Sequence, residues 1–163
     1  MNDVSLRTHE IIEKDLDCYG DMILRLAYSY MKNIHDAEDI VQDVFVQLMK
    51  NIDKFESDEH KKSWLITVTR NLCKNKLKSS WFKKRDELVE MPYYDKYKNN
   101  DVLDTVMKLP LKYREVIHLF YYEDYSTAQI ADIIGKKEST VRSLLHRGRK
   151  ILKDILKEGY DFE

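Results

Sequence analysis

Residues 126–150, STAQIADIIGKKESTVRSLLHRGRK, predict two short helices joined by a tight turn. A helix-turn-helix needs a small residue where its helices touch and a turn residue that tolerates a positive φ angle. Ala131 and Gly135 have these two properties and are correctly spaced. Apolar residues recur around them at helical spacing, and they are Ile130, Ile134, Val141 and Leu144. The stretch therefore predicts a C-terminal helix-turn-helix.

The second helix of this pair is strongly basic, although the whole chain has a formal net charge of −1. Residues 136–157 contain eight basic and two acidic residues. The polar residues on or beside one outer face of this helix are Arg142, Ser143, His146, Arg147, Arg149 and Lys150. On such a face arginine can fork to guanine edges in a major groove, while lysine and serine reach phosphates. The pattern favours duplex DNA binding over its alternative, a basic face that is merely solvated.

Residues 60–85 form a second basic block, with nine basic and no acidic residues. Trp64, Trp81 and Phe82 are interleaved with these charges. Positive grooves that carry aromatic side chains suit single-stranded nucleic acid, because bases stack on the rings. Trp64 also falls on the apolar face of the helix expected here, so a place in the core is the alternative for its ring.

The segment before this block has the opposite charge. Residues 10–59 contain thirteen acidic and five basic residues. Within it, the sequence DAEDIVQDVFVQLMKN, residues 36–51, predicts an amphipathic helix. The residues along its polar side are Glu38, Asp39, Gln42, Asp43 and Val46. DNA would repel this face, so it is either solvated or directed at a protein partner with a basic surface.

The composition predicts an all-α protein, since glycine and proline number only 4 and 2 and helix-tolerant residues dominate. We expect two small helical domains joined by a linker. Residues 10–85 form the first domain, residues 86–101 form the linker, and residues 102–157 form the helix-turn-helix domain.

Three helices are expected in the first domain, over residues 10–31, 36–51 and 61–85. Gly20 is expected to break the first helix, and Asp36 is expected to cap the second. The apolar face of the third helix is predicted to contain Trp64, Leu65, Val68, Leu72 and Leu77.

Cys18 and Cys73 stand far apart, without the spacing of a zinc site or a disulfide framework, so both are expected to be buried free thiols. The N-terminal residues lack an apolar signal core, and no apolar run reaches the roughly eighteen residues of a membrane span. We therefore expect a cytoplasmic protein. No metal site, cofactor or catalytic motif is indicated.

Three segments resemble the extracytoplasmic-function (ECF) group of bacterial sigma factors, within the sigma-70 family. They are DAEDIVQDVFVQLMKN, SWLITVTRNLCKNKLK and LPLKYREVIHLFYYEDYSTAQIADIIGKKESTVRSLLHRGRK. They occur in the family's order, and the resemblance covers residues 10–157. The chain departs from the family in having Gly148 between Arg147 and Arg149, where the family usually has alanine.

The resemblance implies three binding surfaces. The residues that would meet the clamp helices of core RNA polymerase are Glu38, Asp39, Gln42, Asp43 and Val46. The residues that would lie near the melted strand of the −10 promoter element are His60, Lys61, Lys62, Trp64, Arg70, Asn71 and Lys74. The residues that would read the −35 element as duplex DNA are Lys137, Thr140, Arg142, Ser143, His146, Arg147 and Arg149. The loop FESDEHKKS, residues 55–63, would hold a flipped base.

The same resemblance implies the partners. They are core RNA polymerase, through its clamp helices and flap, and promoter DNA in both double- and single-stranded form. An anti-sigma factor, in many members of the group membrane-bound, is also implied. The protein would direct promoter-specific transcription initiation, with no enzymatic activity and no small-molecule substrate.

Two other classes of protein are alternatives to a sigma factor. A helix-turn-helix transcriptional regulator with an N-terminal sensing or partner-binding domain explains residues 102–157 equally well. It does not explain an acidic helix followed directly by a basic block. A nucleic-acid enzyme would need a metal-ligand motif, a P-loop or a triad, and the histidines are scattered along the chain.

Overall fold

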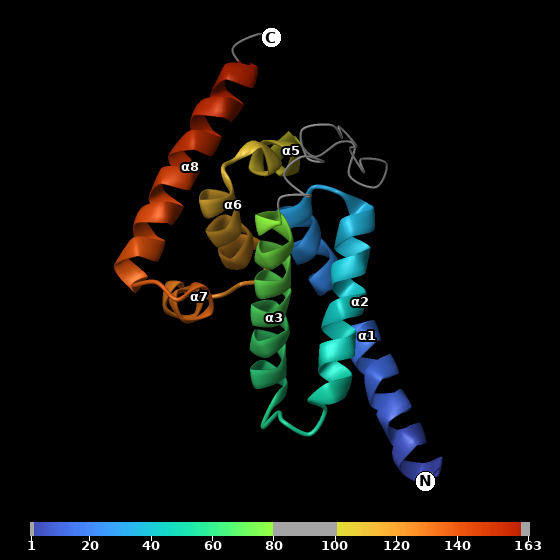
Figure 1. Cartoon of the computed structure of the whole chain (residues 1–163). Coiled ribbons are helices and arrows are strands. Elements are labelled where there is room, and N and C mark those ends of the chain that lie inside the picture. The colour runs from blue at the N-terminus through green and yellow to red at the C-terminus, as the bar shows by residue number, and fades with distance from the viewer. Residues whose placement is uncertain (1, 80–100, 161–163) are drawn as a thin grey trace. The chain divides into compact units, whose positions relative to one another are not determined.

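The computed structural model describes residues 2–79 and 101–160, and the regular elements in these ranges are helices. The prediction of an all-α protein is confirmed (Figure 1). The chain divides into two compact units, Met1–Pro92 and Tyr93–Glu163, and each unit is described by itself below. The expected linker, 86–101, lies almost wholly outside the described residues, as do Trp81 and Phe82.

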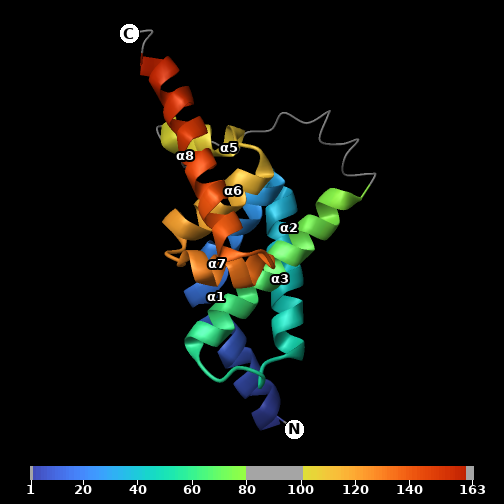
Figure 2. The same cartoon turned by 90° about the vertical axis from the view of Figure 1, so that its left-hand side faces the viewer.

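The described part of the first unit consists of α1 (Asn2–Met31), α2 (Ile34–Lys50) and α3 (Asp58–Lys78). Each of the three helices contacts the other two. The largest fully buried side chains of their shared core are Ile23, Leu26, Tyr30, Met31, Ile40, Leu48, Leu65 and Ile66. Two perpendicular views show the N-terminal turns of α1 continuing past the loop that joins α2 to α3 (Figures 1 and 2).

The expected break in α1 is absent, because the helix runs unbroken through Gly20 from Asn2 to Met31. A glycine in a helix costs about 1 kcal/mol relative to alanine. The buried residues that follow it, including Met22, Ile23 and Leu26, anchor this part of α1 against its neighbours. Tertiary packing therefore outweighs the local helix propensity here.

The starts of α2 and α3 also differ from the prediction. Asn33, not Asp36, caps α2, since its side chain accepts a hydrogen bond of 3.1 Å from the Asp36 backbone N–H. Asp36 instead lies inside the first turn and is only 3% exposed. Ser57 caps α3 by accepting from the His60 N–H, so the helix begins before the basic residues at 61.

The buried stripe of α3 is rotated relative to the predicted apolar face, and the two share Leu65. The buried residues are Leu65, Ile66, Thr69 and Cys73, whereas Trp64, Val68, Leu72 and Leu77 are only partly buried. Thr69 tolerates complete burial because its hydroxyl donates to the Leu65 carbonyl at 2.7 Å. A buried threonine and a buried cysteine weaken the apolar periodicity from which the face was predicted.

The two cysteines differ in their surroundings. Cys73 is buried as expected, and its burial raises the pKa of the thiol to about 12. The expectation for Cys18 was wrong, because this residue lies on the exposed side of α1. A cysteine next to apolar positions in sequence can still lie outside the helix's buried stripe.

The second unit contains α5 (Asp101–Lys108), α6 (Leu111–Ile117), the π-helical turn η1 (His118–Tyr122), α7 (Thr127–Ile134) and α8 (Glu138–Tyr160). α7 and α8 form the predicted helix-turn-helix (Figure 1). Ser126 caps α7 in a capping box with Gln129, and Gly135 ends α7 at a φ of 69°. The conformational role predicted for Gly135 is confirmed.

Gly148 lies where α8 passes α6. A Cβ atom added there would come within 2.7 Å of Ile117 Cδ1 and 3.3 Å of Tyr113 Cβ. The absence of a side chain lets the two helices approach closely, so α8 is fixed on α6 at this point.

Candidate nucleic-acid and polymerase interfaces

The predicted duplex-contacting residues lie at the start and along the first turns of α8, and their side chains are all exposed. Lys137 directly precedes the helix, and the other six residues lie on it. Arg142 Nη1 lies 3.1 Å from Glu138 Oε1, one turn earlier. The same Glu138 oxygen accepts a hydrogen bond of 2.7 Å from Thr127 Oγ1 on α7. This second contact joins the two helices of the motif across their turn.

Arg149 differs from the other basic residues of α8. Its guanidinium lies over the rings of Phe120 and Tyr121, 5.3 Å and 5.5 Å from their centroids. Its Nε also donates to the Tyr121 hydroxyl at 2.6 Å. The side chain is thus directed toward η1, where it ties α8 to the segment before the motif. The sequence pattern did not predict this contact, because no local spacing relates residues 121 and 149.

An aromatic cluster orders the loop that precedes α3. The Phe55 ring packs edge-on against His60 and Trp64, with ring centroids 5.6 Å and 5.1 Å apart. Lys54 and Lys61 place their ammonium groups 5.9 Å from the Trp64 centroid and 5.8 Å from the Phe55 centroid. Trp64 is partly buried, so it is neither a core residue nor a fully exposed stacking platform. The cluster therefore orders the loop and places the ammonium groups of two lysines beside the aromatic rings.

Lys61 is held by a second contact, which links α3 to α1. Its Nζ lies 3.0 Å and 3.2 Å from the two carboxylate oxygens of Asp15. The side chains are only 16% and 7% exposed. Lys61 therefore anchors the base of the loop, while the other predicted −10 residues range from exposed His60 and Asn71 to partly buried Lys62, Arg70 and Lys74.

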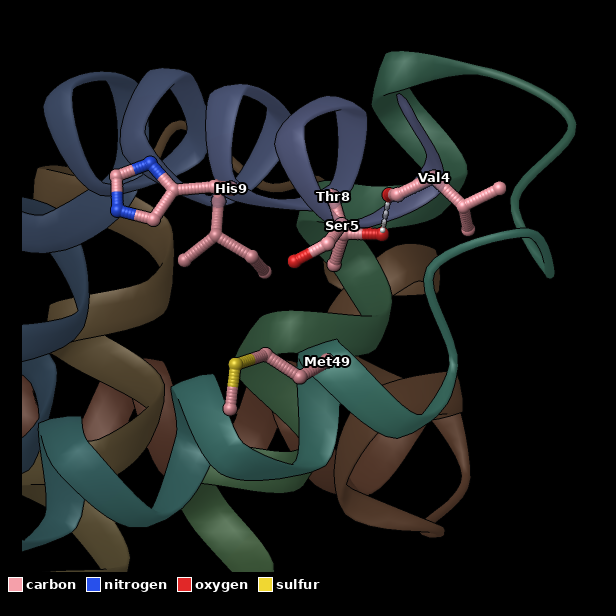
Figure 3. A pocket seen from close by; sticks show the side chains of 6 residues that line it. Val4, Ser5, Thr8, His9 and Met49 are labelled. Atoms are coloured by element: carbon pink, nitrogen blue, oxygen red, sulfur yellow. Dashed lines mark hydrogen bonds between the residues drawn. The ribbon is translucent and has the colours of Figure 1, made fainter. Parts of the chain in front are cut away.

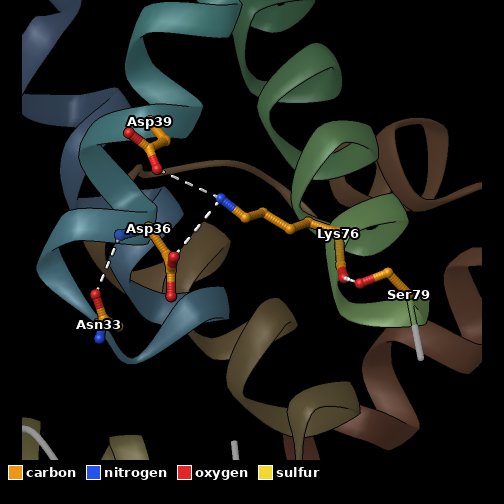
Figure 4. Close-up of polar contacts among 5 residues, drawn as sticks. All are labelled: Asn33, Asp36, Asp39, Lys76 and Ser79. Atoms are coloured by element: carbon orange, nitrogen blue, oxygen red, sulfur yellow. Dashed lines mark hydrogen bonds and ion pairs between the residues drawn. The ribbon is translucent and has the colours of Figure 1, made fainter. Parts of the chain in front are cut away.

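The acidic residues predicted to meet polymerase form one exposed face of α2, which includes Val46 at 43% exposure. Lys76 of α3 reaches the edge of this face (Figure 4). Its Nζ lies 3.7 Å from Asp39 Oδ2 and 3.6 Å from Oδ1 of the buried Asp36. Asp39, one of the acidic residues predicted to meet polymerase, is therefore within ion-pair distance of a lysine of α3. The only sequence signal for Lys76 was its membership in the basic block.

An apolar depression lies beside the far end of this face. It is lined by Val4, Ser5, Thr8, His9 and Ile12 of α1 and by Met49 of α2. Met49 faces these α1 side chains, and the Thr8 hydroxyl turns back to the Val4 carbonyl at 2.9 Å (Figure 3). The prediction did not include this feature, because the first helix was expected to start near residue 10.

Across the described part of the chain, His, Cys, Asp and Glu side chains do not gather in groups of three or more that could hold a metal ion. Within residues 2–79 and 101–160, no helix combines the length and apolar character needed to cross a bilayer.

Comparison with known proteins places both units in one family. Residues 16–83 match the family model for Sigma-70 region 2, and residues 99–152 match that for Sigma-70, region 4. The chain is 31% identical to the RNA polymerase sigma factor SigV of Bacillus subtilis, over 79% of this chain and 81% of SigV. It is 29% identical to the ECF RNA polymerase sigma factor SigW of the same organism, over 88% of this chain and 87% of SigW.

A solved structure has the same fold. The sigma factor RpoE of Bartonella quintana, crystallised with the anti-sigma factor NepR, matches with a TM-score of 0.72 and 24% identity, over 89% of this chain and 96% of RpoE. The chain belongs to the sigma-70 family of RNA polymerase sigma factors, and within it to the ECF group. It is a transcription initiation factor that acts with RNA polymerase at specific promoters, and such factors are not enzymes.

Proposed function

We propose that the three surfaces divide the work of initiation. The exposed α2 face, formed by Glu38, Asp39, Gln42, Asp43 and Val46, docks on core polymerase. The loop before α3 and the basic residues of α3 hold the melted −10 strand. The front of α8 reads the −35 duplex. In terms of the chain, residues 10–85 carry the first two roles, residues 102–157 carry the third, and residues 86–101 join them.

One observation carries this proposal: two helices of the same three-helix unit present opposite charge. The exposed side of α2 carries Glu38, Asp39 and Asp43, whereas α3 after its first turn has no acid and has six basic residues, Lys61, Lys62, Arg70, Lys74, Lys76 and Lys78. Adjacent surfaces of opposite sign favour two partners of opposite charge, and DNA can satisfy only one of them. The acidic surface suits a basic protein, and exposed Val46 adds an apolar side chain at one end of it.

The aromatic cluster supports the role of the loop. A strand that loses base stacking on melting needs rings or cations that replace part of the lost energy. Partly buried Trp64 and its neighbour Phe55 are held in a fixed arrangement, with Lys54 beside the indole. Lys61, which is paired with Asp15, serves in this proposal to position the loop more than to contact phosphate.

Region 4 is proposed to read DNA from the front half of α8. Arg142, His146 and Arg147 are exposed there. Arg149 is assigned a supporting role because its guanidinium already stacks on Phe120 and Tyr121. We also propose that an anti-sigma factor restrains this chain, as NepR is bound to RpoE in the crystal, and that the protein acts in the cytoplasm, where polymerase and chromosome are found.

Charge reversal on α2 tests the polymerase assignment. Asp43→Lys is expected to weaken binding to core enzyme at least tenfold in a competition assay and to reduce run-off transcription in proportion. Asp17→Lys, an equal change of charge at an exposed site on α1, is the matched control and is expected to bind normally. Equal affinity of the Asp43→Lys variant and the unsubstituted chain would refute the proposed docking face.

A further inference from the structure

Glu138 is an unexpected residue on a surface that binds DNA. It is the only acidic residue between Asp132 and Asp154, and it stands at the first position of the recognition helix. A carboxylate there is repelled by DNA phosphates. A favourable interaction with the helix dipole would explain an acid at this end of α8. It would not explain why the Glu138 side chain also contacts Thr127 and Arg142.

Both contacts use the same carboxylate oxygen. Glu138 Oε1 accepts a hydrogen bond from Thr127 Oγ1 at 2.7 Å and lies 3.1 Å from Arg142 Nη1. Thr127 is the first residue of α7, so the hydroxyl fixes the carboxylate from the opposite side of the turn. The carboxylate in turn fixes the exposed guanidinium of Arg142, whose side chain is 60% accessible.

We propose that Glu138, held by Thr127, is the positioning residue that directs Arg142 at one base pair of the −35 element. The inference rests on the proposed role of α8 as the reader of duplex DNA. A guanidinium has five N–H donors in a rigid plane, so Glu138 can occupy Nη1 while the Nε and Nη2 edge stays available. That edge matches the O6 and N7 acceptors of guanine.

The three side chains act as one unit because an exposed ion pair alone is a weak constraint. Pairs spaced by one helical turn contribute little when water surrounds them. The hydrogen bond from Thr127 removes part of the carboxylate's freedom before DNA arrives. Exclusion of water by the bound duplex then strengthens the contact between Glu138 and Arg142.

The experiment measures base preference in complete holoenzyme, reconstituted from core polymerase and the full chain. Bound templates are selected from a duplex pool that is randomised over the −35 region, and the preference at each position is obtained by sequencing. Arg142→Ala identifies the position that Arg142 reads, where we expect preference to fall about tenfold or more. Glu138→Gln and Thr127→Val are then expected to flatten preference at that same position about fivefold.

Matched variants separate positioning from charge and from folding. Asp132→Asn removes an exposed acid from α7 and is expected to leave every preference unchanged. Thr127→Ser keeps the hydroxyl and is expected to restore the preference lost in Thr127→Val. Glu138→Gln is also expected to bind all duplexes more tightly, because one repulsive charge is gone, whereas Thr127→Val is not.

Four results would overturn the inference. Full preference at the Arg142 position in both Glu138→Gln and Thr127→Val would show that Arg142 needs no positioning. A change at a different position would show that Glu138 reads a base itself. If Arg142→Ala alters no position while Arg147→Ala does, the assignment of Arg142 fails and the proposed reading role of α8 survives. If no α8 substitution alters any preference, the proposed function of the helix fails as well.

Discussion

At the scale of single residues, two glycines in helices behave differently because their surroundings differ. Gly148 faces α6, where an added Cβ would lie 2.7 Å from Ile117 Cδ1 and 3.3 Å from Tyr113 Cβ. Gly20 faces only Leu16 of its own helix, whose Cδ1 would be 3.3 Å away. Neighbouring side chains therefore crowd position 148, where this chain has glycine and the family usually has alanine.

Alanine substitution at the two glycines is expected to have opposite effects. Gly148→Ala gains about 1 kcal/mol of helix propensity but overpacks a contact with buried Ile117, a cost of about 1–3 kcal/mol, so a net loss of stability is expected. Gly20→Ala is expected to raise the free energy of unfolding by about 0.5–1 kcal/mol, since flexible Leu16 can move. Urea denaturation measures both, and a gain from Gly148→Ala would show that α6 and α8 can separate without cost.

The two cysteines should differ in reactivity in the native state. The pKa of Cys73 is raised to about 12 by burial, so its thiolate is scarce at pH 8, whereas Cys18 is exposed. Iodoacetamide at that pH is expected to label Cys18 alone, and Cys73 only after unfolding. Mass spectrometry of labelled peptides checks this, with Cys18→Ser as the control that should remain unlabelled.

The same shift makes stability depend on pH in one direction. A raised pKa in the folded state means that the unfolded chain loses the Cys73 proton first, beginning near the ordinary value of 9.0. The contribution of this thiol to the free energy of unfolding is therefore complete below pH 9.0 and decreases as pH rises toward about 12.

At the scale of elements, α3 is held to each of its two neighbours by a lysine. Lys61 near its start pairs with Asp15 of α1, and Lys76 near its end lies between Asp36 and Asp39 of α2. Both lysines belong to the block whose charge predicted nucleic-acid binding. Part of the basic charge on α3 therefore neutralises carboxylates within the unit, which net charge along the sequence could not distinguish from charge available to DNA.

Removing the carboxylate of Asp15 should destabilise the first unit. Asp15→Asn leaves Lys61 without its anion, and we expect a loss of about 2 kcal/mol, less than for a fully buried charge because the ammonium can turn toward water. The double variant Asp15→Asn/Lys61→Met should recover part of this loss. Denaturant unfolding of the four chains gives the coupling energy, and additive losses would mean that the pair contributes nothing.

Lys76 should make Asp39 and Asp43 of the α2 face unequal. The charge of Asp39 is partly compensated at 3.7 Å by Lys76, so Asp39→Asn is expected to reduce affinity for core polymerase less than Asp43→Asn. In a Lys76→Met background the two losses should become similar. Competition binding with core enzyme measures both, and a larger loss for Asp39→Asn in the unsubstituted chain would contradict this ranking.

At the scale of the whole molecule, a net charge of −1 hides an acidic segment and two basic blocks. The all-α class, the helix-turn-helix and the segregation of charge could be predicted because they depend on composition and local spacing. The rotation of α3, the burial of Asp36 and the contact between Arg149 and Tyr121 could not. Each of these depends on which other helix lies alongside, and periodicity within one helix carries no such information.

The acidic face should also limit binding of DNA by the free chain. Neutralising Asp39 and Asp43 together is expected to raise affinity for nonspecific duplex DNA about two- to fivefold at low salt, since both acids are exposed and repel phosphate. The gain should vanish near 0.5 M salt, because the Debye screening length is then only about 4 Å. Fluorescence anisotropy across a salt series measures it, and a gain that persists at high salt would point to a change in structure.

α8 is fixed at two places, at its front by Thr127 and Glu138 and further along by Gly148 and Arg149. Between them, Ser143, His146 and Arg147 face outward and are exposed. Substitutions in that interval are expected to leave the packing of the helix intact, because these side chains are exposed. If α8 reads the −35 duplex as proposed, we expect new promoter preferences to be reached by few substitutions between these two fixed points, and retargeted variants to be engineered at the same positions.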